Sequence, residues 1–195
     1  MRDVHLGRAL LATARIAIGS ELGRRVGPWP EHDALASPGA TFVTLMKCDG
    51  LRGCIGSLQA RRALRDDVRI NAVAAAFGDP RFSPLRDDEF DDMSVEVSLL
   101  SSPERLESEE ETDVLARLRP DVDGVILEYG AQRATFLPQV WESLPSPREF
   151  LIELKRKAGL PADFWSRSMQ VSRYVVDKWR ENDFAARQER GKEAA

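Results

Sequence analysis

The sequence predicts an α+β fold, in which helices pack on an antiparallel β-sheet. Segments with apolar residues at helical spacing alternate with short runs rich in β-branched residues, and two pairs of these runs flank tight turns, at Asp49-Gly50 and at Gly130. Strands joined by such turns pair in antiparallel fashion. With 195 residues, of which 43% are hydrophobic, the chain is long enough for one domain with a sizeable core.

The first half of the chain contains two predicted helices on either side of a hairpin. Apolar residues recur at helical spacing over residues 4–22, and Gly23 marks the end of this helix. A loop rich in Pro and Gly follows, and residues 41–58 form the hairpin. A second helix is expected over residues 64–77, because glycine and proline follow it directly.

The second half continues the alternation. We expect a strand over residues 93–102, a short helix over 108–120, two strands over 123–139, a helix over 146–161 and a last strand over 171–179. Ser108 with Glu111 has capping-box spacing, and Ser146 is the expected cap of the longer helix. Residues 1–182 are predicted to form a single domain, and residues 183–195 a charged, frayed tail.

Charge and the N-terminus narrow the class of protein. The net charge is −4 and basic and acidic residues are interspersed, so no basic stripe predicts a nucleic-acid surface, although a local patch keeps RNA binding open. Arg8 and Arg15 interrupt the apolar run near the N-terminus. The sequence therefore predicts neither a signal peptide nor a membrane helix, and we expect a cytoplasmic protein.

The sequence lacks the common motifs for binding metals and nucleotides, so we expect any catalysis to use the protein's own side chains. The chain has two cysteines and two histidines but no CxxC, HxH or HExxH, so no metal site is predicted. GxGxxG and GxxxxGK[ST] are also absent, and we expect no cofactor. Catalysis would then depend on a thiol, carboxylates or arginines.

The segment LRGCIGS, residues 51–57, places Cys54 between two glycines. A two-residue turn in the hairpin would pair Cys54 with Leu45, whereas a three-residue loop would pair it with Thr44. In either register Cys48 and Cys54 are roughly 10 Å apart along the ladder, which is too far for a disulfide. Both thiols are therefore expected to be free.

Two interpretations of Cys54 stay open. Arg52, two positions before it, favours a reactive thiolate, whereas burial against Leu45 opposes one. Cys54 is then either a functional thiol with room for a substrate beside it, or a small buried hydrophobe in a tightly packed strand.

Two further candidates lie at the end of the second predicted helix. Arg81, in the turn Asp79-Pro80-Arg81-Phe82, either binds a carboxylate or phosphate or pairs with Asp79 to stabilise the turn. Asn71 sits on or beside the apolar face of the helix and bonds either a ligand or the backbone.

The remaining candidates lie on predicted strands and loops. Glu96 alternates with Val95 and Val97, so it is solvated unless the sheet is covered on both faces. Gln139 and Trp141 follow a strand that ends near a proline, where they line a groove or, for Trp141, belong to the core or its rim.

Taken in order, these segments resemble the AMMECR domain family, whose prokaryotic members are called AmmeMemoRadiSam system protein A. The resemblance runs from about Leu6 to Trp179. It is carried by TFVTL, LRGCIGSL, DVRINAVAAAFGDPRFSPL, VEVSLLSSPERL, DGVILEYGAQRATFLPQVWESLP and FLIELKRKAGLP, and by FW at 164–165. LRGCIG is the family signature, and the chain has Ala63 where many relatives have proline.

The resemblance implies a larger antiparallel-sheet region and a smaller lobe, with the signature cysteine near a cleft between them. It also implies partners, namely a Memo-like protein and a radical S-adenosylmethionine enzyme from the same gene neighbourhood, with RNA or a small molecule as ligand or substrate. No biochemical activity is established for the family. The family positions present here are Arg52, Gly53, Cys54, Gly56, Asn71, Asp79, Pro80, Arg81, Phe82, Glu96, Phe136, Pro138, Gln139 and Trp141.

Two functions fit these residues. The first is a thiol-dependent enzyme or enzyme subunit, in which Cys54 is the nucleophile or acid–base group and Asp79 or Glu96 orients the reacting groups. Its substrate would be held by Arg52, Asn71, Arg81, Gln139 and Trp141. The second is a non-catalytic binding or adaptor protein whose cleft docks a partner or a nucleic acid.

Overall fold

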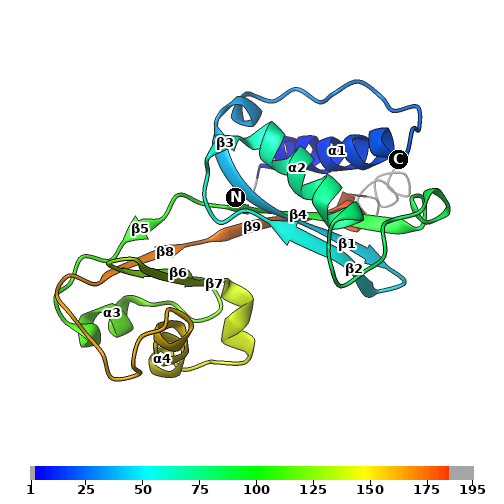
Figure 1. Ribbon diagram of the computed structural model, residues 1–195. Coiled ribbons are helices and arrows are strands. Elements are labelled where there is room, and N and C mark those ends of the chain that lie inside the picture. The colour runs from blue at the N-terminus through cyan, green and yellow to red at the C-terminus, as the bar shows by residue number, and fades with distance from the viewer. Residues whose placement is uncertain (1–2, 185–195) are drawn as a thin grey trace, which may run out of the picture. The chain divides into compact units, whose positions relative to one another are not determined.

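The computed structural model describes residues 3–184, which divide into two units (Figure 1). Unit 1 contains the chain up to Leu100 and from Asp177 onward, and unit 2 is the continuous segment Ser101–Val176. Each unit has its own sheet and its own hydrophobic core. The predicted α+β class is confirmed.

The sheet of unit 1 is built from strands that are distant in the sequence. Its order is β2 (Gly50–Gly56), β1 (Pro38–Lys47), β4 (Met93–Leu100) and β9 (Val176–Arg180), and β3 (Arg62–Ala63) pairs with the start of β1. β1 is antiparallel to β2, β3 and β4. Because side chains alternate along a strand, Val43, Leu45 and Val97 all point to one face, where each has no exposed surface.

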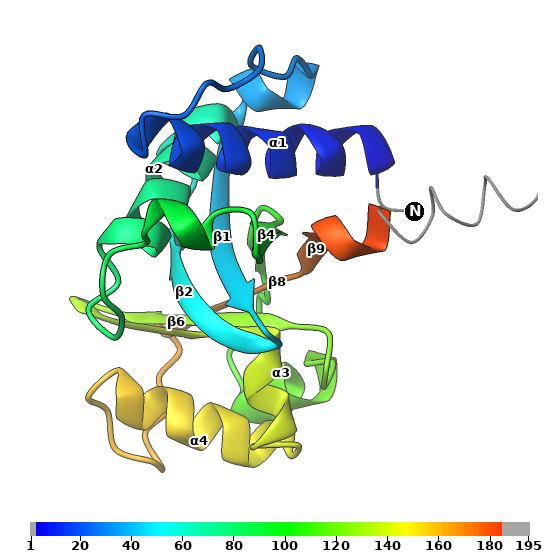
Figure 2. The same ribbon diagram turned by 90° about the vertical axis from the view of Figure 1, so that its right-hand side faces the viewer.

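Two helices, α1 (Val4–Glu21) and α2 (Leu64–Phe77), cover that face of the sheet (Figure 2). Asp3 caps α1 by accepting hydrogen bonds from the first backbone amides, and Gly23 follows its end with a φ of 72°. The apolar stripes of both helices enter the core beside the strand residues, with Leu10, Ile18 and Val68 fully buried. Within residues 3–184, no helix of unit 1 covers the opposite face of the sheet.

Unit 2 repeats the design on a smaller scale. Its sheet order is β5 (Glu104–Arg105), β8 (Gln170–Tyr174), β6 (Gly124–Tyr129) and β7 (Gln132–Phe136), and its helices are α3 (Glu111–Arg117) and α4 (Pro147–Lys157). Its core contains Trp141, which stacks on Phe150 with ring centroids 3.8 Å apart. Lys155 is also buried there, with its Nζ bonded to Glu111.

The hairpin of unit 1 exists as predicted, but its turn lies one residue earlier. Cys48 and Asp49 are the central residues, with φ values of 48° and 60°, and Lys47 pairs with Gly50. A turn with positive φ at both central positions matches the twist of antiparallel strands, and Asp tolerates this conformation. Gly50 is therefore the first residue of β2 rather than part of the turn.

Other details of the elements also differ from the prediction. The last predicted strand breaks at Val175, so that β8 joins the sheet of unit 2 and β9 joins that of unit 1. The capping box predicted for α3 does not form, because the helix begins later and Ser108 Oγ instead accepts from the Glu110 amide. Ser146 stands at the N-cap of α4 without a side-chain cap bond. Most of the predicted tail, residues 185–195, lies outside the described residues.

No helix within residues 3–184 combines the length and the apolar character needed to cross a bilayer.

Candidate functional site

A bulge in β2 sets the position of Cys54. Met46 pairs with Leu51 and Leu45 pairs with Gly53, so Arg52 is an extra residue on β2. Beyond the bulge Cys54 pairs with Thr44, the register that the sequence predicted for a longer loop. The register results from two differences: the two-residue turn lies one residue earlier than predicted, and the bulge then adds one residue to β2.

Cys54, Thr44 and Glu96 form a row across three neighbouring strands, because Thr44 of β1 pairs with Cys54 on one side and with Glu96 of β4 on the other. Paired residues point to the same face of a sheet, here the face opposite α1 and α2. The Thr44 hydroxyl donates a hydrogen bond to Cys54 Sγ at 3.3 Å. Adjacent strands lie about 5 Å apart, so Glu96 is roughly 10 Å from Cys54, with Thr44 between them.

The outer edge of β2 at Cys54 is closed by side chains rather than by another strand. Asp79 Oδ2 accepts a hydrogen bond from the Cys54 amide at 2.9 Å, and Arg81 Nη2 donates to the Cys54 carbonyl oxygen at 3.2 Å. The two side chains also form an ion pair, with Arg81 Nη2 and Asp79 Oδ2 2.6 Å apart. The sequence left two roles for Arg81, binding an anion or stabilising the turn with Asp79. The structure shows the Asp79–Arg81 pair, and the same two side chains also hold the backbone of Cys54.

The electrostatics of this clamp favour a permanently charged carboxylate. The hydrogen bonds from the Arg81 guanidinium and then from the Cys54 amide hold the pKa of Asp79 well below its usual range. The same ion pair raises the pKa of Arg81. Asp79 is buried, whereas the Arg81 side chain is 53% exposed. Asp79 is thus suited to orienting groups and poorly suited to accepting a proton.

The glycines on either side of Cys54 are required by packing. A Cβ at Gly53 would lie 2.1 Å from the carbonyl oxygen of Ala75 in α2, and one at Gly56 would lie 2.3 Å from the ring of Phe42. No side chain fits at either distance. The glycines therefore let α2 and the neighbouring strand approach β2 closely.

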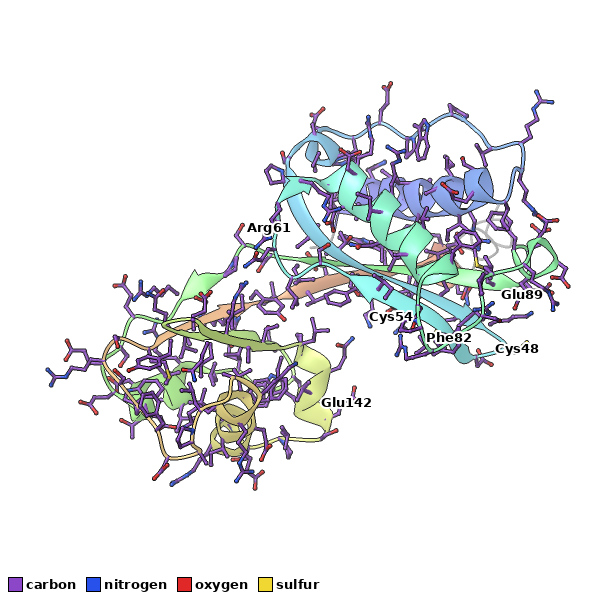
Figure 3. All side chains as sticks on the ribbon, viewed as in Figure 1. Cys48, Cys54, Arg61, Phe82, Glu89 and Glu142 are labelled. Carbon is purple, nitrogen blue, oxygen red and sulfur yellow. The ribbon has the colours of Figure 1, made fainter. Side chains whose placement is uncertain are left out.

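Arg52 is committed to a carboxylate on another segment. Its Nε and Nη2 donate to the two oxygens of Glu89, in η2 (Asp87–Glu89), at 3.1 and 3.0 Å. Lys47 Nζ also reaches Glu89 at 3.0 Å, and the Arg52 guanidinium lies 6.0 Å from the centroid of the Phe82 ring. The bond from Arg52 is the main reason why the pKa of Glu89 lies well below its usual range. Arg52 thus anchors the hairpin to the segment that follows Phe82. Figure 3 labels Phe82 and Glu89 on that segment and Cys54 on β2.

Glu96 carries the row on to the next strand. Its side chain is 13% exposed and forms ion pairs with Lys178 at 2.9 Å and Arg180 at 2.6 Å, both on β9. Glu96 is therefore largely covered rather than solvated, which is close to the buried carboxylate that the sequence left as the alternative. A hollow of about 520 Å³ lies beside it and is lined by Met46, Glu96 and Arg180 among others. Cys54 does not line this hollow, but Met46 is only two residues from Thr44 on the same strand.

The other predicted site residues lie apart from this row. Asn71 is buried in α2, where its Nδ2 donates to the Thr41 carbonyl oxygen and to Asp67. Trp141 is 1% exposed in the core of unit 2, with its Nε1 bonded to the Asp123 carbonyl oxygen. Asn71 and Trp141 have the geometry of structural residues, as the alternatives for both proposed. Gln139 is exposed on η3 (Pro138–Glu142) of unit 2.

Thr44, Lys178 and Arg180 were not among the site residues predicted from the sequence, although Thr44 was named as a possible pairing partner of Cys54. Thr44 could have been found from its place between Val43 and Leu45, which puts it on the polar face of the strand. The two β9 cations carry no local signal, because only the sheet order brings β9 beside Glu96. Among the described residues, no group of three or more His, Cys, Asp or Glu side chains is arranged to hold a metal ion.

A family model described as AMMECR1 matches residues 11–179, which include the whole row and the clamp around Cys54. The chain belongs to the AMMECR1 family. An uncharacterised protein of Methanothermobacter thermautotrophicus is 40% identical over 185 residues, covering 90% of this chain and 94% of that relative. A relative from Methanopyrus kandleri is 37% identical over 169 residues, covering 82% of this chain and 80% of the relative.

A solved structure supports the fold as well. The crystal structure of the uncharacterized protein PH0010 from Pyrococcus horikoshii matches with a TM-score of 0.74 and 31% sequence identity, covering 93% of each chain. At this identity and coverage the similarity extends to both units. Since these relatives are uncharacterised proteins, function has to be argued from the residues of the site.

Proposed function

We propose that this AMMECR1-family protein is a thiol-dependent enzyme, or the thiol-bearing subunit of one, with Cys54 as its reactive group. The observation that carries the proposal is the way Cys54 is held. Its amide and carbonyl are fixed by Asp79 and Arg81, and its half-buried Sγ accepts a hydrogen bond from Thr44. A packed structural cysteine needs neither a clamp nor a hydroxyl donor.

This geometry assigns different roles to the candidate residues. Thr44 donates to the sulfur and so stabilises negative charge that develops on it during a reaction. Asp79 orients Cys54 through the backbone and stays ionised. Arg81, about half exposed, offers its remaining donors to an anionic group of the substrate, whereas Arg52 is occupied by Glu89.

The partners belong to the same proposal. We expect Cys54 to act together with a Memo-like protein and a radical S-adenosylmethionine enzyme in the cytoplasm, on RNA or on a small molecule. The hollow beside Glu96, which Met46 also lines, offers space on the same sheet face for part of such a substrate.

Alkylation rates test the reactivity of Cys54 directly. Cys48 is exposed and Cys54 is half-buried, so accessibility alone predicts that iodoacetamide modifies Cys48 faster. The proposal predicts the opposite order at neutral pH, measured by mass spectrometry of timed samples. Thr44→Val keeps the shape of the side chain but removes the donor, and it is expected to slow alkylation of Cys54 several-fold without changing Cys48. Cys48→Ser is the matched control and should leave the rate at Cys54 unchanged.

An equal or slower rate at Cys54 than at Cys48, or an unchanged rate in Thr44→Val, would count against thiol chemistry. A Cys54→Ser variant assayed with the radical enzyme then separates the two functions. Loss of product with an intact complex supports catalysis, whereas loss of the complex supports a docking role.

A purely structural role for the Asp79–Arg81 pair is favoured by one observation. The Asp79–Arg81 pair occupies both backbone groups of Cys54 on an edge strand, which is also a way of protecting a sheet edge from unwanted pairing. In that case Asp79→Asn would weaken the edge without altering any chemistry at sulfur.

A further inference from the structure

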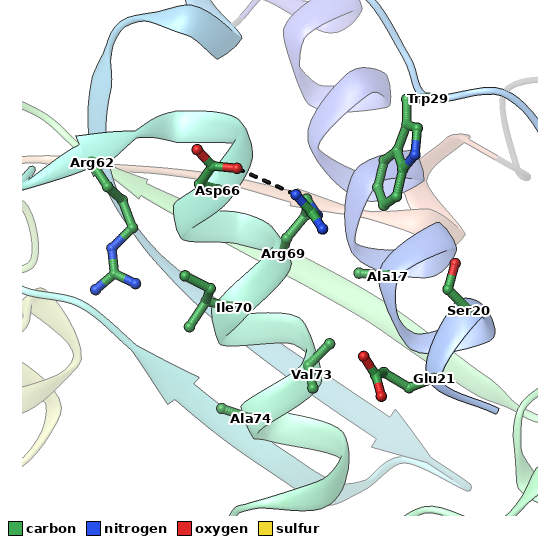
Figure 4. Close-up of a pocket in the computed structure, with 10 residues that line it drawn as sticks. All are labelled: Ala17, Ser20, Glu21, Trp29, Arg62, Asp66, Arg69, Ile70, Val73 and Ala74. Atoms are coloured by element: carbon green, nitrogen blue, oxygen red, sulfur yellow. Dashed lines mark hydrogen bonds and ion pairs between the residues drawn. The ribbon is translucent and has the colours of Figure 1, made fainter.

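A second hollow, of about 750 Å³, lies in unit 1 where α1, α2 and the loop carrying Trp29 meet (Figure 4). Its surface is apolar where Ala17 of α1 and Val73 and Ile70 of α2 line it. Ile70 is 50% exposed, although it is a large aliphatic residue on a helix. An apolar hollow of this size, bordered by a few charged groups, has the composition of a small-molecule site.

Trp29 is presented to this hollow rather than packed into a core. It is 40% exposed, whereas Trp141 and Trp179 are 1% and 5% exposed. Proline precedes and follows it, at positions 28 and 30, and restricts the backbone on both sides. A rigidly held aromatic surface loses little conformational freedom when a ligand packs against it.

Charges of opposite sign face the hollow from two sides. The Arg69 guanidinium lies 5.0 Å from the centroid of the Trp29 ring and 3.4 Å from Asp66, and both members of that pair are about half exposed. Such a pair contributes little, so the guanidinium can turn to a ligand. Glu21 ends α1 on the other side, and within residues 3–184 its carboxylate has no ion-pair partner. Figure 4 shows Ala17 between Arg69 and Glu21.

We propose that this hollow binds a free amino acid with a large apolar or aromatic side chain. The carboxylate of the ligand pairs with Arg69 and its ammonium group with Glu21, while its side chain packs on Trp29 and the aliphatic surface of Ile70 and Val73. The pair of opposite charges flanking an apolar surface distinguishes this ligand from a purely apolar segment of a partner protein. The site is separate from the row that contains Cys54.

Three probes with the same ring test the charge requirement. Calorimetric titrations of the full-length protein compare L-tryptophan, which is zwitterionic, with indole-3-propionate, which lacks the ammonium group, and tryptamine, which lacks the carboxylate. L-Tryptophan is expected to bind most tightly, and removal of either charge to weaken binding about three- to fivefold.

Variants assign each charge to its residue. In Glu21→Gln, L-tryptophan is expected to lose its advantage over indole-3-propionate but to keep its advantage over tryptamine. In Arg69→Gln the reverse is expected. Trp29→Ala should weaken all three probes about tenfold. Glu142→Gln and Arg148→Gln, at exposed positions of unit 2, are the matched controls and should change nothing.

The outcome that overturns the proposal is equally specific. Equal affinities for the three probes, an unchanged preference in Glu21→Gln or Arg69→Gln, or no binding at millimolar concentrations would each exclude an amino-acid site. Circular dichroism and the rate of Cys54 alkylation verify that each variant is folded. Because that rate reports on the other site, failure of this proposal and failure of the proposed thiol chemistry are distinguishable.

Discussion

Gly53→Ala is the perturbation whose effect follows most directly from the structure. The new Cβ would lie 2.1 Å from the carbonyl oxygen of Ala75, and both atoms belong to regular backbone that cannot rotate away. To restore an ordinary contact, β2 and α2 must separate by about 1 Å, which also lengthens the Cys54–Asp79 hydrogen bond. Overpacking of this kind costs about 2–3 kcal/mol, after allowance for the small stabilisation that Gly→Ala brings through the unfolded chain.

Urea denaturation followed by circular dichroism measures this loss. Gly50→Ala is the matched control on the same strand, because its Cβ would lie 3.3 Å from the Lys47 carbonyl oxygen and its φ is not positive. We expect the control to stay within about 0.5 kcal/mol of the natural protein. If Gly53→Ala is as stable as Gly50→Ala, the argument that the glycine exists for close packing against α2 is wrong.

Three further predictions concern charged groups. Because the folded-state pKa of Asp79 is depressed, its contribution to stability is present above its unfolded pKa of about 3.9 and is lost as the pH falls below that value toward the folded-state pKa. Urea midpoints of Asp79→Asn should therefore depend less on pH below about 4 than those of the natural protein. Glu96→Gln should leave the alkylation rate of Cys54 unchanged, because the carboxylate is one strand too far to contact sulfur. Glu111→Ala should destabilise the protein by about 3 kcal/mol in urea, since it leaves the buried Lys155 ammonium uncompensated, whereas Lys155→Met should be nearly neutral.

Each of these has a result that contradicts it. An Asp79→Asn protein with the same acid dependence as the natural chain would show that the carboxylate is not stabilised by folding. A several-fold change of alkylation in Glu96→Gln would place that group in the reaction. Equal destabilisation by Glu111→Ala and Lys155→Met would mean that packing, rather than the buried charge, sets the stability of α4.

The elements that sequence reasoning located well are those whose signal is local. The span of α2 was predicted to the residue, because apolar spacing defines the helix and Gly78 and Pro80 end it. The hairpin was also found, but its turn was placed one residue late and its bulge was not foreseen. The bulge lies where β2 packs closely on α2, at Gly53. Contacts between segments distant in the sequence are not encoded in a local residue pattern.

The candidate site shows the same division. Cys54, Asp79 and Arg81 were identified from the sequence, and the structure brings them together through backbone contacts that no spacing rule predicts. Arg52 was a candidate for favouring the thiolate and for binding a substrate, and the structure shows it on the bulge of β2 with its guanidinium paired to Glu89. The sequence alone did not predict which residue of a distant segment each site side chain contacts, such as Glu89 for Arg52.

The connectivity of the two units also constrains how the protein is made. Unit 2 is a continuous insertion, and its ends are held together where the Ser101 amide bonds the Val175 carbonyl oxygen and the Val175 amide bonds Ser101 Oγ. During translation the ribosome therefore completes all of unit 2 before it synthesises β9, the last strand of unit 1. Until β9 is synthesised, the edge of β4 that pairs with it has no partner strand. A stalled or truncated chain therefore exposes this edge of β4, including Glu96, which Lys178 and Arg180 pair with in the complete fold.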